Sequence, residues 1–216
     1  RKRLTASKFG EVCKMRETTS CKIMVSNIIY SREFFSRVCQ YGKDNEAAAK
    51  ESVEKIIGKT IRPCGLFIDE EFSFLGASLD GMIEDKNILE IKCPWSARNV
   101  TPEEVVKRKF LSFCNNSTGE VNQNLNWVYQ IQGQLHIAKK SYCVFAVWTP
   151  YGVKIETIFR DDDVFWLTKI ETKLKAFYLN CLLPELVEPR RPRNMPIRDP
   201  GYIEEATTEN KKRKQL

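Results

Sequence analysis

The sequence predicts a single domain of the α/β class, because helical and strand-like patterns occupy separate stretches of a 216-residue chain. Hydrophobic residues make up 42% of the chain and aromatic residues 11%, which is enough for one sizeable core. That apolar content excludes disorder throughout, and no window approaches the ~18 consecutive apolar residues that a membrane span needs. We therefore expect a soluble chain with no membrane partner.

The first quarter of the chain has helical patterns. Residues 5–58 start with Thr5 or Ser7, both of which can cap a helix, and continue with apolar residues at helical spacing. The strongest segment is Asp44–Ile57, which is rich in alanine, glutamate and lysine, and Gly58 supplies a stop signal.

The pattern then changes to strands. Three apolar runs predict a meander, with Asp85–Asn87 as the turn between the last two. The runs are Gly65–Asp69, Phe74–Glu84 and Ile88–Cys93.

The second half alternates between helices and strands. Thr101 can cap a helix over about 102–110, since proline follows it and a glutamate lies three residues on. The elements predicted after it are a loop over Cys114–Gly119, a helix over Asn122–Ala138, strands over Tyr142–Thr149 and Val153–Phe159, and a helix from Asp161 to about Leu182.

The positive charge lies at the two ends of the chain. The net charge is +7; Arg1–Arg3 contribute three basic residues, and the segment 190–216 has eight basic residues against four acidic ones. Such ends suit a polyanionic partner, but they also occur as solubilising tails. We divide the chain into a folded domain, 1–188, and a basic, proline-rich tail, 189–216, in which Ala206–Leu216 is expected to be disordered.

Cysteine and histidine usage argues against zinc. The eight cysteines include no C-x-x-C pair, and His136 is the only histidine and lies near no cysteine pair. We expect reduced thiols in the core and a structural role for His136. The first residues contain no apolar stretch of a secretory signal, so we expect an intracellular protein.

The segment that suggests chemistry is Leu89–Pro94. In a strand, alternate side chains share a face, so Glu90 and Lys92 point one way while the apolar residues between them point to the core. A hairpin partner can bring Asp80 beside them. Two carboxylates and a lysine suit phosphodiester hydrolysis, with Mg²⁺ on the hard oxygens and the lysine orienting water or offsetting charge. An ordinary surface ion pair is the alternative.

Three motif blocks resemble the YqaJ-like viral recombinase family, the phage lambda exonuclease family of PD-(D/E)XK nucleases. The blocks appear in family order and span about residues 4–160. They are Leu4–Gly10; Gly42 with Glu46, followed by Gly76–Gly81 and Leu89–Pro94; and Tyr129–Leu135.

The resemblance implies a fold and the role of each matched residue. The fold would be a PD-(D/E)XK, restriction-endonuclease-like core, with a central mixed β-sheet flanked by helices. Asp80 and Glu90 would bind the metal with the Ile91 carbonyl, Glu46 would complete the acidic cluster, and Lys92 would be the catalytic lysine. The positions that match contacts to a terminal 5′-phosphate of DNA are Ser7, Ser78 and Gln130.

Two places depart from the family pattern. The family's phosphate-binding arginine would lie just upstream of Arg1, so either it precedes the given sequence or Arg1 or Arg3 substitutes for it. The family's proline before the aspartate is Leu79 here. Arg3 and Gln132 are candidate DNA contacts. Gln134 on the same helix could also touch DNA, but exposed glutamines on a helix are equally ordinary.

The resemblance implies a Mg²⁺-dependent exonuclease that degrades linear double-stranded DNA in the 5′→3′ direction, with Mn²⁺ able to substitute for Mg²⁺. The alternatives are a structure-specific endonuclease of the same superfamily and a catalytically inactive nucleic-acid-binding domain. Implied partners are double-stranded DNA and an annealing protein or recombinase, with the chain a monomer or a trimer. Lys211–Lys214 would suit nuclear import if the source is eukaryotic or viral, or a nonspecific DNA contact.

Overall fold

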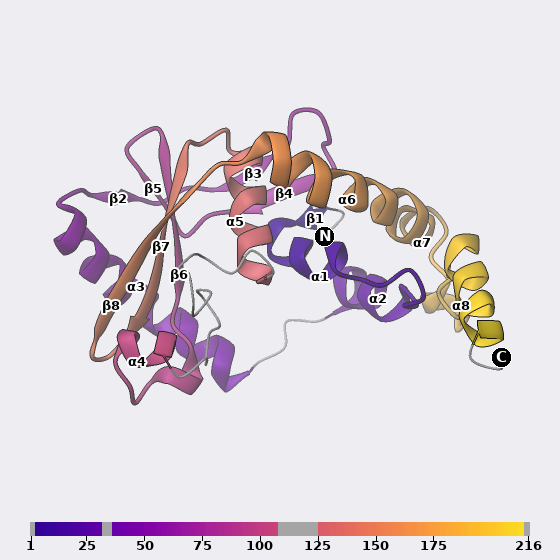
Figure 1. The fold of residues 1–216 in the computed structure, drawn as a ribbon, viewed down its shortest axis with the longest axis horizontal. Coiled ribbons are helices and arrows are strands. Elements are labelled where there is room, and N and C mark those ends of the chain that lie inside the picture. The colour runs from indigo at the N-terminus through magenta and orange to yellow at the C-terminus, as the bar shows by residue number, and fades with distance from the viewer. Residues whose placement is uncertain (1–2, 32–35, 108–124, 214–216) are drawn as a thin grey trace.

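The computed structural model describes residues 3–31, 36–107 and 125–213. Figure 1 shows the larger sheet at one end of an elongated molecule and the helix α8, Gly201–Arg213, at the other end. Within the described residues, no helix combines the length and the apolar character that crossing a lipid bilayer requires.

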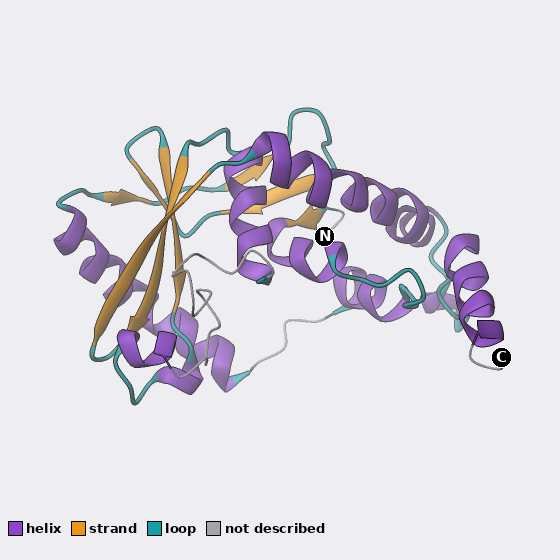
Figure 2. Ribbon diagram, in the orientation of Figure 1, coloured by secondary structure: helices purple, strands orange, loops and turns teal. Residues whose placement is uncertain are grey.

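The strands form two sheets, shown in orange in Figure 2. The three-stranded sheet has the order β1-β4-β3, in which β1 and β4 are parallel. The five-stranded sheet has the order β2-β5-β6-β7-β8, in which β6 and β7 are parallel and the other neighbours antiparallel. The strands are β1 Leu4–Thr5, β2 Ile61–Arg62, β3 Leu66–Ile68, β4 Leu75–Ser78, β5 Gly81–Ile83, β6 Asn87–Lys92, β7 Tyr142–Thr149 and β8 Gly152–Phe159.

Strands β6 and β7 are covered on both faces, as parallel strands usually are. Ile88 and Phe145 belong to the main apolar cluster on one face. Leu89 and Val144 belong to a second cluster on the other face. Residues 87–91 of β6 are therefore buried, whichever face their side chains lie on.

Helix α3, Arg37–Ile57, covers the face of the second cluster, where Ala49 and Val53 are fully buried. The helix begins at Ser36, whose hydroxyl accepts a hydrogen bond from the Val38 amide. It ends at Gly58, which has a φ of 65° and donates its amide to the Glu54 carbonyl. The predicted stop is confirmed, but the helix starts seven residues earlier than the Asp44 that we expected.

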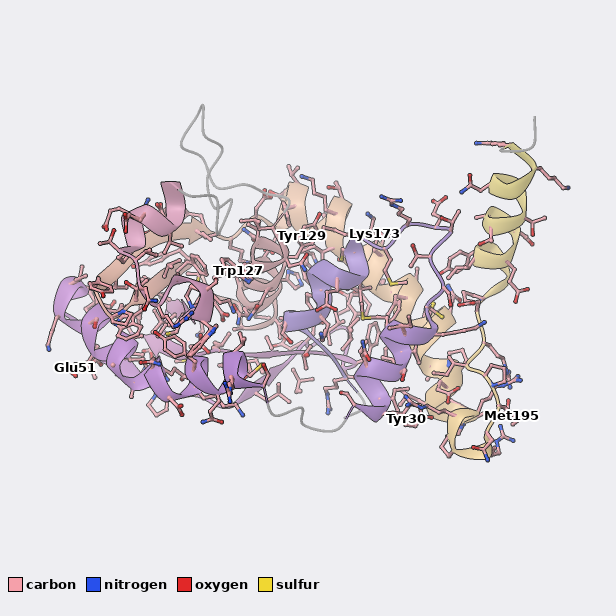
Figure 3. The ribbon with its side chains drawn as sticks, turned by 90° about the horizontal axis from the view of Figure 1, so that it is seen from below. Tyr30, Glu51, Trp127, Tyr129, Lys173 and Met195 are labelled. Atoms are coloured by element: carbon pink, nitrogen blue, oxygen red, sulfur yellow. The ribbon has the colours of Figure 1, made fainter. Side chains whose placement is uncertain are left out.

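Helix α5, Asn126–Ile137, covers the other face together with α1, Phe9–Cys13. These helices approach closely at two glycines. A Cβ atom at Gly133 would lie 2.4 Å from the Phe9 ring, and one at Gly10 would lie 2.5 Å from the backbone of Asn126. Both positions therefore exclude a side chain. Figure 3 shows Trp127 and Tyr129 on α5 in the middle of the molecule.

One long helical run follows the sheet and is capped by Asp161, which accepts hydrogen bonds from the amides of Val164 and Phe165. It comprises the π-helical stretch η3 Asp162–Glu171, α6 Thr172–Phe177, the π-helical stretch η4 Tyr178–Leu182 and α7 Leu183–Val187. The predicted start is confirmed, while the helical run extends five residues past Leu182.

The C-terminal segment packs back on the domain. Asp199 accepts hydrogen bonds from the Cys21 amide and the Ser20 hydroxyl, next to helix α2, Lys22–Tyr30. Ile203 on α8 is only 5% exposed. Helix α8 thus occupies residues for which composition predicts disorder. The division of the chain at residue 188 stays a prediction.

The predicted meander is wrong. The expected single strand Phe74–Glu84 is two strands, β4 and β5, which lie in different sheets and are separated by Leu79 and Asp80. The chain bends there because each half has a different partner: β4 pairs with β1 and β3, whereas β5 pairs with β6. Gly81 fits this crossover, since a Cβ atom there would lie 2.3 Å from the Ile61 side chain.

The remaining elements follow the sequence closely. The capping box of α4, Pro102–Lys107, is formed: Thr101 and Glu104 each donate an amide to the other's side chain. Residues 108–124 lie outside the described part, so the expected loop Cys114–Gly119 and the expected start of α5 at Asn122 fall there. Strand β1 was not predicted, because its two residues pair only with the distant β4.

Candidate active site

Glu90 is a buried carboxylate in the centre of the larger sheet. It lies on β6 opposite Phe145 of β7, and it is 2% exposed. The sequence predicted a side chain that projects from a half-exposed strand, but α5 covers this face. Gln130 of α5 donates to Oε1 of Glu90 at 2.7 Å, so the carboxylate is satisfied by polar groups of the covering helix.

Asp80 lies at the crossover between β4 and β5, beside β6, the strand that bears Glu90. Its Oδ2 accepts a hydrogen bond of 2.7 Å from the Ile91 amide. Burial, and then the nearby Glu90 carboxylate, raises the pKa of Asp80 to about 7. Asp80 and Glu90 are therefore brought together, as the sequence predicted, and they repel each other when both are ionised.

Lys92 shares a face with Glu90 and donates a hydrogen bond to its Oε1. Its ammonium also lies 3.4 Å from Oε1 of Gln130 and 5.8 Å from the centre of the Trp127 ring. The side chain is 23% exposed. The ammonium therefore combines a fixed position with access to solvent.

Glu46 is the candidate site residue on α3. It forms an ion pair of 2.6 Å with Lys50, one helical turn later, and its side chain is 41% exposed. Burial is the largest cause of the raised pKa values of Asp80 and Cys93, and the Glu46 charge adds to both, so Glu46 lies within electrostatic reach of these two side chains. Glu46 is the outer member of the acidic group that the resemblance implies.

The three predicted phosphate-binding residues come from three elements. Thr5 of β1 pairs with Gly76 of β4 in parallel, so Ser7 and Ser78 both follow at the carboxyl ends of these strands. Both serines are exposed. The Ser7 hydroxyl lies 3.2 Å from that of Thr5, and Gln130 is engaged with Glu90. The two serines thus share one end of the smaller sheet.

Arg3 and Gln132, two of the candidate DNA contacts, have different surroundings. Arg3 is exposed and donates its Nε to the Ser73 carbonyl at 2.9 Å. Gln132 is 5% exposed, donates to the Phe159 carbonyl and accepts from the Asp161 amide. Its amide ties α5 to the end of β8, roughly 200° around the helix from Gln130. Neither DNA contact is tested by this geometry, and both stay predictions.

The sequence offered Gln134 only as a possible DNA contact on an exposed helix face, not as a partner of the acidic residues. It is fully buried, and its Nε2 lies 2.6 Å from Oε2 of Glu90 and 2.9 Å from the Ser78 carbonyl. The spacing of four residues from Gln130 places both glutamines on one face of the helix and is the signal that could have identified it.

The carboxylates fit a hard divalent cation. Among the described residues, no set of three or more His, Cys, Asp or Glu side chains is arranged to hold a metal. Mg²⁺ does not require one, since it binds through one or two carboxylates and keeps waters or phosphate oxygens in its other positions. Asp80 and Glu90 supply two such oxygen donors, with a raised Asp80 pKa that a cation would relieve. Ile91 is a third expected ligand through its carbonyl.

The single histidine is structural, in agreement with the sequence. Its ring stacks on Trp166 with centroids 3.8 Å apart, and Nδ1 lies 2.8 Å from the Asp162 carboxylate. The cysteines in the described residues are all free, and Cys13, Cys21, Cys143 and Cys181 are buried, as expected for thiols of the core. Cys39 is exposed and Cys64 and Cys93 are only partly buried, so the expectation of core thiols is wrong for these three.

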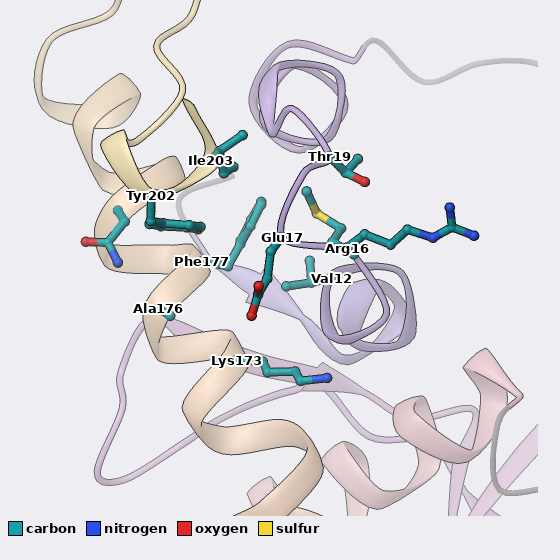
Figure 4. A pocket seen from close by; sticks show the side chains of 11 residues that line it. Val12, Arg16, Glu17, Thr19, Lys173, Ala176, Phe177, Tyr202 and Ile203 are labelled. Atoms are coloured by element: carbon teal, nitrogen blue, oxygen red, sulfur yellow. The ribbon is translucent and has the colours of Figure 1, made fainter. Parts of the chain in front are cut away.

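A pocket of about 530 Å³ lies elsewhere, between α1, α6 and α8 (Figure 4). Val12, Phe177 and Ile203 form its apolar lining, and Arg16 and Lys173 are among its charged residues. None of the acidic residues predicted for catalysis lines it.

Comparisons with known proteins agree with this arrangement. The family model of the YqaJ-like viral recombinase domain matches residues 1–141. The crystal structure of an alkaline exonuclease, LHK-Exo, from Laribacter hongkongensis has a TM-score of 0.66 and 23% identity, over 89% of this chain and 93% of that one. The same exonuclease in complex with dAMP also has a TM-score of 0.66, with 22% identity over the same shares of both chains.

A phage-related exonuclease from Haemophilus somnus 129PT has a TM-score of 0.58 and 12% identity, over 81% of this chain and 91% of that one. No curated protein matches the chain. The predicted fold, a PD-(D/E)XK core with a mixed β-sheet flanked by helices, is confirmed by these neighbours and by the sheet topology.

Proposed function

Because the chain belongs to the YqaJ-like viral recombinase family, we propose that it is a DNA exonuclease that hydrolyses phosphodiester bonds with the help of a bound divalent metal. The observation that carries the proposal is the convergence of Asp80, Glu90 and Lys92 on β6 and its neighbouring crossover. The three neighbouring structures described above are of proteins named as exonucleases, which supports the proposal.

Each of these side chains has a chemical task in the proposed reaction. Asp80 and Glu90 hold the metal, with the Ile91 carbonyl as a further ligand and Glu46 beside them. Bound Mg²⁺, or Mn²⁺ in its place, supplies an activated water and stabilises charge on the phosphate oxygens. Lys92 is held by Glu90, and from there its ammonium can orient the attacking water or offset charge on the phosphate.

The proposed substrate is the end of a linear DNA duplex. Ser7 and Ser78 present hydroxyls at one end of the smaller sheet, and Gln130 donates a hydrogen bond to Glu90 on the larger sheet. Hydroxyl and amide groups can donate to a terminal 5′-phosphate without adding a charge that would retain the product. A 5′-phosphate held in this place would set the 5′→3′ direction.

Two alternatives use the same surface. A structure-specific endonuclease would need no terminal phosphate, so the pair of exposed serines favours an exonuclease. An inactive nucleic-acid-binding domain would have no need for a second carboxylate beside Asp80, and the pKa of Asp80, raised by burial and by the Glu90 charge, argues against it.

End-labelled linear duplex and covalently closed duplex, each incubated with Mg²⁺ and with chelator, test the proposal. We expect release of labelled nucleotide from the linear DNA with Mg²⁺ alone. Cleavage of closed circles would favour the endonuclease, and DNA binding without cleavage in any condition would favour the inactive domain.

We propose two further properties, the oligomeric state and the place where the protein acts. The chain acts as a monomer or as a trimer around duplex DNA, which light scattering distinguishes. It works inside the cell, with an annealing protein or recombinase as partner and with nuclear import if the source is eukaryotic or viral. Co-purification with such a protein tests the partner.

A further inference from the structure

Gln134 connects two parts of the candidate site. Its side chain is 0% exposed, and one nitrogen, Nε2, lies 2.6 Å from Oε2 of Glu90 and 2.9 Å from the Ser78 carbonyl oxygen. Ser78 ends β4, two residues before Asp80, while Glu90 lies on β6 of the other sheet. A single amide therefore bridges the strand that leads to one carboxylate and the strand that bears the other.

The orientation of this amide follows from its partners. Both neighbouring atoms are acceptors, so the group between them must be the NH₂ group, which has two hydrogens to donate. The amide oxygen is buried and has no hydrogen-bond partner among the described residues. An unpaired buried acceptor lowers the stability of a protein, so the amide oxygen does not explain why a polar residue lies here. The NH₂ group, which donates two hydrogen bonds, does.

The two oxygens of Glu90 are held from two directions. Oε1 accepts from Gln130 and Lys92, and Oε2 accepts from Gln134. The carboxylate plane is fixed as long as both oxygens keep a donor. Without Gln134, only Oε1 would be held, and the carboxyl group could rotate about its last side-chain bond.

We propose that Gln134 is a positioning residue that fixes the orientation of Glu90 and its place relative to the Asp80 crossover, so that the two carboxylates can share a divalent cation. The inference rests on the proposed function. Ligating carboxylates are commonly held by such hydrogen-bonding partners, whose loss typically weakens metal affinity or activity by ~10- to 100-fold. Gln134 contacts neither the cation nor DNA in this proposal.

The decisive variant is Gln134→Met, which keeps the length of the side chain and removes the donor. Gln132→Met is the matched control for metal affinity, because it removes a buried glutamine from the same helix without touching Glu90. Gln134→Asn keeps an NH₂ group on a shorter side chain and serves if the methionine variant does not fold.

Titration calorimetry with Mn²⁺ alone gives the affinity without turnover, and digestion of linear duplex at increasing Mg²⁺ gives the concentration for half-maximal rate. We expect Gln134→Met to weaken both by ~10- to 100-fold, Gln134→Asn to weaken them less, and Gln132→Met to keep the Mn²⁺ affinity while lowering the melting temperature.

An unchanged Mn²⁺ affinity in a folded Gln134→Met protein, or in Gln134→Asn where the methionine variant fails to fold, would overturn the inference and leave the nuclease proposal standing. An equal loss of affinity in Gln132→Met would overturn it as well, since any buried amide would then have the same effect. A wild-type protein that neither binds Mn²⁺ nor digests DNA would overturn the proposed function together with the inference.

Discussion

The carboxylate of Asp80 accepts a hydrogen bond from the main-chain amide of Ile91, with 2.7 Å between Oδ2 and the nitrogen. Ile91 lies between Glu90 and Lys92 on β6, so this bond fixes the crossover residue beside the two polar side chains of the strand. The raised pKa of Asp80 and the expected metal affinity both follow from this placement.

The first prediction concerns pH. In the metal-free folded protein the pKa of Asp80 is about 7, against 3.8 in the absence of burial and neighbouring charge. Between these values the folded protein binds more protons than the unfolded chain, so this group makes the free energy of unfolding decrease as pH rises from about 4 to about 7. Asp80→Asn cannot ionise and should lose that part of the pH dependence.

Chemical denaturation in chelator at several pH values measures this dependence for the wild type and Asp80→Asn. If the free energy of unfolding changed with pH in the same way in both proteins, the prediction would be wrong. At the upper end of the pH range, Mg²⁺ should stabilise the wild type but not the variant, because a protein is stabilised by what binds only its folded state.

The second prediction separates catalysis from metal binding. Lys92→Ala keeps Asp80 and Glu90, so the Mg²⁺-induced rise in melting temperature should largely persist, while the rate of DNA digestion should fall by ~10²-fold or more. Duplex binding should also persist, because phosphate contacts elsewhere supply most of the affinity. Glu90→Ala should lose both digestion and the rise in melting temperature. A Lys92→Ala protein that digests DNA at the wild-type rate would remove Lys92 from the catalytic set.

The third prediction concerns the end of the DNA. If Ser7, Ser78 and Gln130 bind a terminal phosphate, a 5′-phosphorylated blunt duplex should be degraded faster than the same duplex with a 5′-hydroxyl. Ser78→Ala should reduce that preference and leave the rate on the 5′-hydroxyl duplex nearly unchanged. The comparison is made at one salt concentration, because phosphate contacts make affinity fall steeply with ionic strength. Equal rates on both duplexes would show that these three residues do not bind a terminal phosphate.

The fourth prediction concerns the C-terminal segment. Deleting residues 206–216 removes the basic end of α8 but keeps Ile203, which is buried against the domain. DNA binding should weaken modestly, with a smaller dependence on salt, and turnover at low salt should persist.

Ile203→Ala is the control for the fold. Truncating a buried isoleucine to alanine costs ~2–5 kcal/mol of stability, whereas the charge of the protein does not change. It should lower the free energy of unfolding and keep the salt dependence of DNA binding. A collapse of turnover in the deletion variant would show that residues beyond 205 are part of the folded domain.

The amino-acid sequence determined the local features of this protein. Short-range signals mark the helix stop at Gly58, the capping box at Thr101 and the helix start at Asp161, and each is formed as predicted. The alternation along β6 correctly separated Glu90 and Lys92 from Leu89. These features depend on neighbours within a few residues, which the sequence displays directly.

The tertiary structure decided how distant segments meet. Strands β4 and β5 belong to different sheets because their partners lie elsewhere in the chain, and no local pattern in Phe74–Glu84 records that choice. The burial of Glu90 and its hydrogen bond to Gln134 likewise depend on α5 packing over β6, 44 positions away in the chain. Hydrophobic periodicity identifies the face of an element that is covered, but only packing of the whole chain determines what covers it.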